Sequence, residues 1–257
     1  MYELSPCIEL LFTEYDRPFL DRIRAAAAAG VPAVEFWFWQ DQDIAEVQAV
    51  LKDTGMSITS LVAEPWGAAI NPDRRPEFLQ GVTQACALAS RLAAPAVVVV
   101  AGDELPEVPR ATQHATVVEA LTAAAPIAAD YGVTLVLEPL NTFDHRGHYL
   151  RDTSEGLDII REVDQRSVRL LYDLYHSVMM GEDPQQVLSG NGDLIAHVQI
   201  ADVPGRGEPG TGNIDWSLQL NTLHDVGYRG RLGLEYYPQT DSAASLAYLQ
   251  RLLSRSV

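Results

Sequence analysis

Cysteine and basic residues are both scarce in this chain of 257 residues. Its two cysteines, Cys7 and Cys86, lie far apart and not in a metal-ligand spacing, so we expect no disulfide framework and a reducing cytoplasm as the compartment. Lys and Arg number 18 against 35 Asp and Glu, which gives a formal net charge of −17. This charge argues against nucleic acid or an anionic membrane as a partner, because either needs a basic face. It is compatible with a site for a cation.

Long apolar runs are missing as well. No stretch reaches the ~18 apolar residues of a membrane span, and the N-terminus lacks the basic and apolar regions of a signal peptide. Hydrophobic residues still make up 47% of the chain, enough for a sizeable core. The length is close to the roughly 250 residues of one (β/α)₈ barrel, and no linker or low-complexity tail marks a boundary. We therefore expect a single domain spanning residues 1–257.

A buried strand that ends in a carboxylate is the feature around which the chain is organised. In Thr134–Asn141, four apolar or β-branched residues run into Glu138, and Pro139 keeps that glutamate extended. The same pattern recurs three times, each about one strand-plus-helix unit further on. These further stretches are Val168–Asp173, Ile195–Gln199 and Arg231–Glu235.

Strand and helix patterns alternate along the whole chain. The predicted strands are Leu4–Leu11, Ala33–Phe38, Ser57–Val62, Ala96–Val100, Thr134–Glu138, Val168–Asp173, Ile195–Ile200 and Arg231–Glu235. The predicted helices are Phe19–Ala29, Ile44–Asp53, Pro76–Leu92, Thr112–Tyr131, Thr153–Val163, a short one from Pro184, Trp216–Val226 and Ser242–Leu253. Eight of each indicate a parallel α/β fold, and the count favours a closed (β/α)₈ TIM barrel over an open sheet.

Two polar loops rich in Gly and Pro interrupt this rhythm, Asn141–Arg151 and Ala201–Asp215. Both follow polar-ended strands directly, so both belong to the C-terminal face, where barrel active sites are built. The alternative is that they are simple surface loops.

The four polar strand ends are predicted to converge. Alternation along each strand sets them on the side that faces the barrel interior, above Val136, Leu171, His197 and Gly233. Three carboxylates and one amide oxygen repel one another unless a cation lies between them, and an all-oxygen set suits Mg²⁺ or Mn²⁺ better than zinc. The alternative is a set of salt bridges to loop arginines. For His197, a hydrogen-bonded core position is favoured over a ligand role. The predicted ligands are Glu138, Asp173, Gln199 and Glu235.

Several motifs resemble the hydroxypyruvate isomerase family of xylose-isomerase-like barrels. They are Glu138-Pro-Leu-Asn141, Asp173-Leu-Tyr-His176, His197-Val-Gln-Ile-Ala201, Pro204-Gly-Arg206, Glu208-Pro-Gly-Thr-Gly212 and Leu234-Glu235-Tyr236. The resemblance implies a divalent ion held by the four residues above, with Glu138 and Glu235 as the acid/base pair. It also implies that His176 and Arg206 contact a small hydroxy-keto acid or sugar substrate.

This chemistry agrees with the residues. Isomerising an α-hydroxy carbonyl moves a proton between neighbouring carbons through an enediolate. A cation can stabilise the enediolate, and two carboxyl groups can take up and return the proton. Arg206 could hold a substrate carboxylate, and Asn141 is a further candidate contact. Glu35 could reach the site or form a buried ion pair beneath it. Trp66 could wall the pocket, together with Trp37 and Trp39, or belong to the core.

The substrate is less well defined than the chemistry. Hydroxypyruvate, interconverted with tartronate semialdehyde, is the first expectation, although Glu35–Asp41 and the Asp144–His148 loop depart from the family pattern. The alternatives are a ketose 3-epimerase, an inosose isomerase or dehydratase, and a sugar-binding barrel without catalysis. An apurinic-endonuclease-like enzyme would need histidines at several strand ends and a basic groove. A homo-oligomer is left open, since no stripe singles out an interface.

Overall fold

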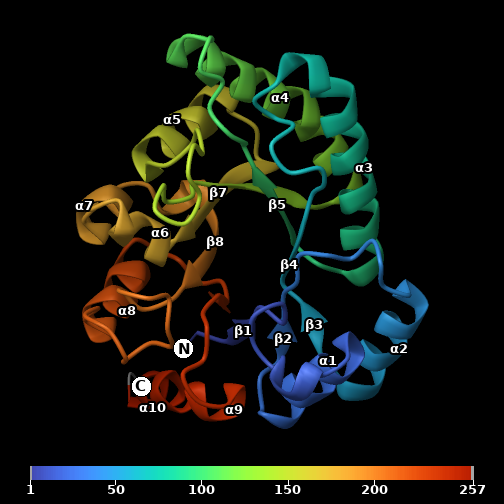
Figure 1. The fold of residues 1–257 in the computed structure, drawn as a ribbon, viewed down its shortest axis with the longest axis vertical. Coiled ribbons are helices and arrows are strands. Elements are labelled where there is room, and N and C mark those ends of the chain that lie inside the picture. Colours follow the sequence, from blue (N-terminus) through green and yellow to red (C-terminus); the bar gives the residue numbers. More distant parts are fainter. Residues whose placement is uncertain (1, 256–257) are drawn as a thin grey trace.

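The strands form a ring with the helices outside it, in the computed structural model that describes residues 2–255 (Figure 1). A parallel sheet of seven strands runs in the order β1-β9-β8-β7-β6-β5-β4, and β2 pairs with β3 in parallel beside it. The strands are β1 (Leu4–Pro6), β2 (Ala33–Val34), β3 (Ser57–Ile58), β4 (Ser60–Val62), β5 (Ala96–Val100), β6 (Thr134–Glu138), β7 (Val168–Asp173), β8 (Ile195–Ile200) and β9 (Leu232–Leu234).

The ring closes through β2 and β3. The backbone N–H of Glu35 donates to Pro6 O at 3.0 Å, which joins β2 to β1. On the other side, the stretch 57–62, predicted as one strand, is divided at Thr59, whose N–H donates to Val34 O at 2.9 Å. Its first half pairs with β2 and its second half with β5, so the chain changes neighbours as it passes around the barrel. The prediction of a TIM barrel is confirmed.

Helices surround the ring in chain order, and their lengths follow local signals (Figure 1). Asp43 accepts hydrogen bonds from the first turn of α2, and Gly132 ends α4 in the left-handed conformation. The helices are α1 (Phe19–Ala28), α2 (Ile44–Thr54), α3 (Arg75–Leu92), α4 (Arg110–Tyr131), α5 (Thr153–Val163), α6 (Leu174–Met179), α7 (Pro184–Leu188), α8 (Trp216–Asp225), α9 (Ser242–Ser245) and α10 (Ala247–Arg255). Short 3₁₀ turns lie at Glu14–Asp16, Pro72–Arg74 and Gly192–Leu194.

The helices differ from the prediction in two places. The segment predicted as a single C-terminal helix from Ser242 is divided into α9 and α10. Helix α6 follows β7 without an intervening loop, because the side chain of Asp173 accepts hydrogen bonds from the N–H groups of Tyr175 and His176. This cap fixes where His176 emerges from the barrel wall.

Apolar side chains fill the barrel on both faces of its strands. One face packs against the helices in a large cluster that includes Val97, Leu135 and Leu170. The alternate residues form a small separate cluster inside the ring, made of Val62, Ala96, Val98, Val136 and Leu171. The prediction that Val136 and Leu171 fill the interior is therefore confirmed, and Glu138 and Asp173 continue the same side of their strands.

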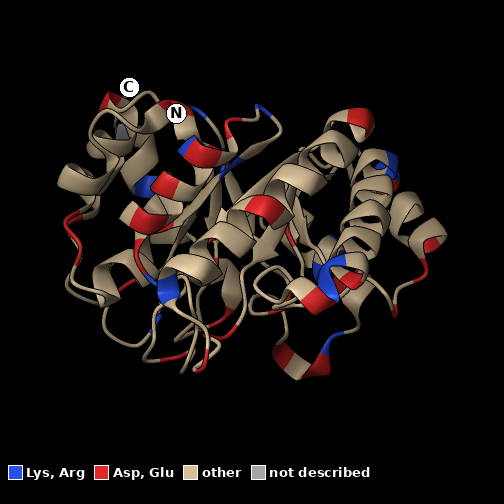
Figure 2. Ribbon diagram, turned by 90° about the horizontal axis from the view of Figure 1, so that it is seen from above, with Lys and Arg blue, Asp and Glu red and all other residues tan. Residues whose placement is uncertain are grey.

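Acidic residues outnumber basic ones, 35 to 18. In Figure 2 the Lys and Arg segments are few and scattered among more numerous Asp and Glu segments. None of the helices in the described chain is long and apolar enough to cross a lipid bilayer.

Candidate active site

The four polar strand ends meet at the C-terminal mouth of the barrel. Glu138 and Asp173 are the last residues of β6 and β7, Gln199 lies in β8 beside Asp173, and Glu235 follows β9 directly. Their exposed fractions are 7%, 3%, 3% and 5%, so all four are buried. Ligand atoms of Glu138, Asp173 and His176 lie within 4.8 Å of one another.

Three of these residues carry a buried oxygen atom without a hydrogen bond among the described residues. They are Oδ2 of Asp173, Oε1 of Gln199 and Oε2 of Glu235. The two carboxylate oxygens are ion-paired to Arg206, whereas Oε1 of Gln199 has neither kind of partner, and a buried acceptor left so costs on the order of 1–3 kcal/mol. Carboxylate and amide oxygens are the donor set of a hard divalent cation. The residues present therefore fit the group that the sequence predicts.

Arg206 reaches into the same place. Its Nη2 lies 3.1 Å from Oε2 of Glu235 and 3.6 Å from Oδ2 of Asp173, and its Nε donates to the backbone oxygen of Glu235 at 3.1 Å. The guanidinium also stacks over the ring of Tyr175, 5.2 Å from the centroid. The sequence alternative, a loop arginine that neutralises the acids, is thus realised for two of the three carboxylates.

His176 is held from behind by Asn141. The backbone N–H of Asn141 donates to its Nδ1 at 3.1 Å, and the amide Nδ2 lies 2.6 Å from the same atom. Since Nδ1 accepts, Nε2 is the nitrogen that can donate. It lies 3.6 Å from Oδ2 of Asp173 and 4.0 Å from Oε1 of Glu138. Burial lowers the pKa of His176 well below its ordinary value, so the ring is neutral.

A buried polar network supports the acids from below. The carboxylate of Glu35 accepts from Ser60 at 2.9 Å and from Nε2 of Gln199 at 3.1 Å, and it lies 2.7 Å from Nε2 of His197. The prediction of a hydrogen-bonded core histidine at 197 is confirmed. Gly233 leaves space for this network, because a Cβ there would lie 2.4 Å from Oε1 of Glu35.

Burial dominates the electrostatics of the site. It raises the pKa of Glu138 well above its ordinary value, and the charges of Glu235 and Asp173 raise it further. Burial likewise raises the pKa of Glu235 to about 8, against the opposing effect of the Arg206 charge. Both glutamates thus have a raised pKa, which favours a carboxyl group that takes up and returns a proton.

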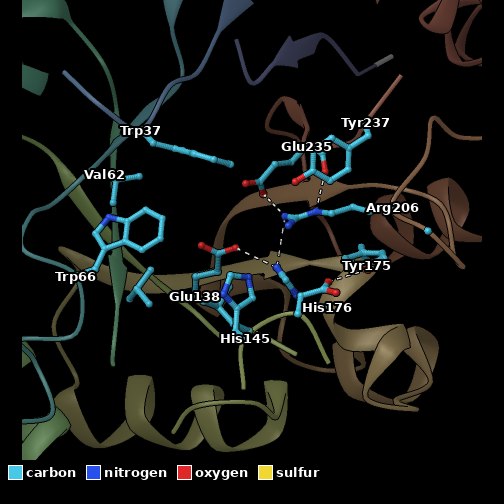
Figure 3. Close-up of a pocket in the computed structure, with 14 residues that line it drawn as sticks. Trp37, Val62, Trp66, Glu138, His145, Tyr175, His176, Arg206, Glu235 and Tyr237 are labelled. Carbon is cyan, nitrogen blue, oxygen red and sulfur yellow. Dashed lines mark hydrogen bonds and ion pairs between the residues drawn. The ribbon is translucent and has the colours of Figure 1, made fainter. Parts of the chain in front are cut away.

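A pocket of about 490 Å³ opens above these groups (Figure 3). One wall is apolar, with Trp37, Val62 and Trp66, and the other presents Glu138, His176, Arg206 and Glu235. Among the sequence candidates, Trp66 is thus on the wall. Asp173, Gln199, Glu35 and Asn141 are not part of the lining. Glu35 lies behind Gln199, and Asn141 lies behind His176. Trp39 donates its indole N–H to Val62 O at 3.0 Å.

Sequence reasoning missed several residues around the pocket. Tyr175, His145 and Tyr237 line it, and Asp144 accepts hydrogen bonds from Tyr175 and Asn141. Tyr175 lies within a recognised motif, and the unusual polarity of the Asp144–His148 loop was the available signal for Asp144 and His145.

The loop that carries Arg206 is organised by Asp202, which the sequence did not single out. Its Oδ1 accepts from the N–H groups of Val203 and Ile214 at 2.9 and 3.2 Å. Its Oδ2 accepts from the N–H of Gly210 at 2.7 Å and from the indole of Trp216 at 2.9 Å. One buried carboxylate thus ties both ends of the loop together.

A family model, xylose isomerase-like TIM barrel, matches residues 23–252. The chain belongs to this family. It is 35% identical to the hydroxypyruvate isomerase of Escherichia coli, over 97% of this chain and 98% of that protein. It is 33% identical to the 2-oxo-tetronate isomerase of Cupriavidus necator, over 96% of this chain and 97% of that one.

The family's solved structures include one described as AP endonuclease, family 2, from Brucella melitensis. It superposes with a TM-score of 0.91 at 30% identity, covering 98% of this chain and 99% of that one. Both curated relatives are isomerases by name, and the chain is accordingly an enzyme of the isomerase type.

Proposed function

We propose that this protein is a divalent-cation-dependent isomerase of α-hydroxy carbonyl acids. Its substrate would be hydroxypyruvate, interconverted with tartronate semialdehyde, or a close relative such as 2-oxo-tetronate. The observation that carries the proposal is the pair of buried glutamates, Glu138 and Glu235, both with a raised pKa at the mouth of one pocket. The names of the full-length relatives support the substrate class.

Four residues would hold the cation. They are Glu138, Asp173, Gln199 and Glu235, of which Gln199 presents an oxygen without a hydrogen-bond partner in the described chain, while Asp173 and Glu235 are ion-paired to Arg206. When bound, Mg²⁺ or Mn²⁺ would supply the positive charge that stabilises negative charge on the substrate oxygens. The network around Glu35 orients the amide of Gln199, because its Nε2 donates to Glu35 and leaves Oε1 for the ion.

The two glutamates would move the proton. Strands β7 and β8 separate β6 from β9, so Glu138 and Glu235 face the pocket from different sides. One carboxylate takes the proton from the carbinol carbon, which gives an enediolate. The other carboxyl group delivers a proton to the neighbouring carbon, and the hydroxyl proton passes to the former carbonyl oxygen, so that the carbonyl and hydroxyl groups exchange places. A raised pKa makes each carboxylate a better base when it is ionised.

Arg206 and His176 would position the substrate. The guanidinium of Arg206 lines the pocket and can present its remaining N–H groups to the substrate carboxylate. The neutral ring of His176 offers an N–H from Nε2, since Asn141 donates to its other nitrogen. Trp37 and Trp66 close the opposite wall and exclude water from the reacting carbons.

Two other chemistries have less support. A ketose 3-epimerase or an inosose dehydratase uses the same enediolate. However, Arg206 can bind a carboxylate, and this favours a substrate that carries an acid group. A nuclease would need a basic surface, whereas the formal net charge is −17 and basic residues are scattered (Figure 2). The paired glutamates argue against a barrel that binds sugar without catalysis.

Both cysteines are buried and unpaired, which agrees with a cytoplasmic location.

Deuterium exchange tests the proposal. With Mn²⁺ or Mg²⁺ present, we expect the enzyme to exchange the carbinol proton of hydroxypyruvate or 2-oxo-tetronate with D₂O, followed by NMR, and to lose this activity on chelation. Exchange into neutral ketoses or inososes but into neither acid would replace this function with one of the alternatives.

A further inference from the structure

Arg206 is the only Lys or Arg side chain that lines the pocket in the described part of the chain. Burial lowers the pKa of both lining histidines, His145 and His176, so neither adds a positive charge at neutral pH. The acids at the mouth of the barrel need this one guanidinium, and so does the carboxylate of the proposed substrate. A single positive charge therefore has two sets of anionic partners.

One nitrogen of Arg206 bridges two of the proposed cation ligands (Figure 3). Its Nη2 lies 3.1 Å from Oε2 of Glu235 and 3.6 Å from Oδ2 of Asp173, so it joins the acids of two different strands. Neither oxygen has a hydrogen bond to another described residue. The third neighbour, Nε2 of His176 at 3.5 Å, carries its own proton and cannot accept one. The guanidinium therefore balances the charge of the same oxygens that a cation would bind.

Other contacts hold Arg206 at the pocket without using these oxygens. Its Nε donates to the backbone oxygen of Glu235 at 3.1 Å, and its own backbone oxygen accepts from the N–H of Tyr237 at 2.8 Å. The guanidinium lies over the ring of Tyr175, whose hydroxyl donates to Asp144 at 2.8 Å. None of these contacts involves a side-chain oxygen of the ligand set. Arg206 can therefore stay beside the substrate space while Nη2 changes its partner.

Two positive charges at the same buried oxygens repel each other, because water and salt screen buried charges only weakly. A cation held by Glu235 and Asp173 thus competes with Arg206, whether the oxygens are shared or given up. Once the acids are balanced by a cation, the guanidinium is a buried charge in need of another anion. The carboxylate of a ligand can meet this need through charge-assisted hydrogen bonds.

We infer that Arg206 couples two binding events. It weakens binding of the cation as long as it is paired with Glu235 and Asp173, and a ligand carboxylate that takes over its guanidinium removes this effect. Cation and acid then bind cooperatively, and by linkage each increases the affinity for the other by the same factor. The inference rests on the proposed function for the cation ligands and for the acid group of the substrate. It adds that Arg206 turns to the substrate only when a cation has taken its place among the acids.

Isothermal titration with Mn²⁺ tests this coupling without turnover. Glycerate and glycerol form a matched pair, because neither has a carbonyl group to isomerise and only glycerate carries a carboxylate. In the wild type, we expect glycerate to tighten Mn²⁺ binding about tenfold and glycerol less than about twofold, within the usual range of coupling between sites. Arg206→Gln should bind Mn²⁺ alone about tenfold more tightly than the wild type and gain less than about threefold from glycerate. Arg146→Gln removes an exposed positive charge from a neighbouring loop and should behave as the wild type.

The outcomes separate the coupling from the activity. Unchanged or weaker Mn²⁺ binding in Arg206→Gln overturns the inference even if the wild type isomerises hydroxypyruvate. An undiminished glycerate effect in this variant overturns it as well, because the acid and the cation would then interact without Arg206. Coupling that depends on Arg206, without turnover of hydroxypyruvate or 2-oxo-tetronate, supports the inference and removes the proposed function. If circular dichroism shows that Arg206→Gln does not fold, Arg206→Met, which keeps an unbranched side chain against Tyr175, takes its place under the same criteria.

Discussion

Arg206 and Glu235 form an ion pair at the centre of the site, with Nη2 and Oε2 3.1 Å apart. Arg206 N–H groups thus neutralise the acids of β7 and β9 and at the same time border the space for the substrate. Glu235 holds the arginine twice, through its carboxylate and through its backbone oxygen. The position of the guanidinium is therefore coupled to the residue proposed to move the proton.

Replacing Arg206 with Ala should raise KM for carboxylate substrates by roughly 10- to 100-fold, in line with the loss of a charge-assisted hydrogen bond. Arg206→Lys keeps the charge but loses the donation from Nε to Glu235 O, so it should recover only part of the affinity. Steady-state kinetics with hydroxypyruvate and a neutral ketose of similar size would measure this. An equal rise in KM for both substrates would show that Arg206 does not bind the carboxylate.

Glu138→Gln and Glu235→Gln should each lower kcat by roughly 10²–10⁴-fold, the range for loss of a general acid or base. Both residues are buried and similar in shape to glutamine, so the fold should persist. Proton exchange in D₂O and circular dichroism would be measured together, with the exposed Glu107→Gln as a control. Full exchange activity in both site variants would discard the two-glutamate mechanism.

Asp173 serves two purposes that different substitutions separate. Its Oδ1 caps α6, whereas its Oδ2 is without a hydrogen-bond partner in the described part of the chain. Asparagine also caps helices, so Asp173→Asn should be more stable than Asp173→Ala by about 1 kcal/mol. Both should bind Mn²⁺ at least about tenfold more weakly than the wild type. Urea unfolding and calorimetric titration measure the two effects, and undiminished Mn²⁺ affinity in both variants would exclude Asp173 as a ligand.

Gly233→Ala should damage the network below the site. The new Cβ would lie 2.4 Å from Oε1 of Glu35 and 2.7 Å from Cγ of Gln199, which costs about 1–3 kcal/mol and displaces Gln199. Gly190→Ala is a matched control, because it has a positive φ of 72° but no described heavy atom within 4 Å of the added carbon. It should lose about 1–2 kcal/mol through backbone strain alone. Only Gly233→Ala should weaken Mn²⁺ binding; equal Mn²⁺ affinities would contradict the supporting role.

Because of His148, the free energy of unfolding should decrease when the pH is lowered from neutral to mildly acidic values. The pKa of this side chain is lowered from 6.5 to about 4 in the folded chain, so the unfolded chain binds the proton more readily. The contribution is complete above pH 6.5 and is lost as the pH falls towards 4, by about 2 kcal/mol between pH 7 and pH 5. Urea unfolding of the wild type and His148→Gln at both values would isolate this part. The same decrease in both proteins would show that His148 does not cause it.

The sequence predicts those parts of the site that depend on regular strands. Alternation along a strand has a fixed period, so Glu138, Asp173, Gln199 and Glu235 could be assigned to one face before any coordinates were known. The division at Thr59 could not be predicted, because it depends on which neighbours the barrel brings to each half of the strand.

Loop positions lay beyond the same reasoning. Arg206 has a φ of +53° and follows Gly205, a backbone path that no periodic pattern encodes. The burial of His148 likewise depends on the packing of Gly67 against Gly102, residues 35 positions apart in the numbering. Such features come from tertiary contacts; the sequence named Arg206 as a candidate contact for a substrate carboxylate but did not indicate the backbone path of its loop.

The hydrogen bonds of Asp202 affect how the substrate specificity of this enzyme can change by substitution. Because three backbone donors of the loop and the indole of Trp216 in α8 converge on its carboxylate, the loop is held as one rigid segment that carries the Arg206 guanidinium. Substitutions elsewhere in the loop can then change the substrate range without moving Arg206, the residue proposed to bind the substrate carboxylate. New substrate specificities would thus arise from changes in the other loop residues, while the position of Arg206 is conserved by its contacts.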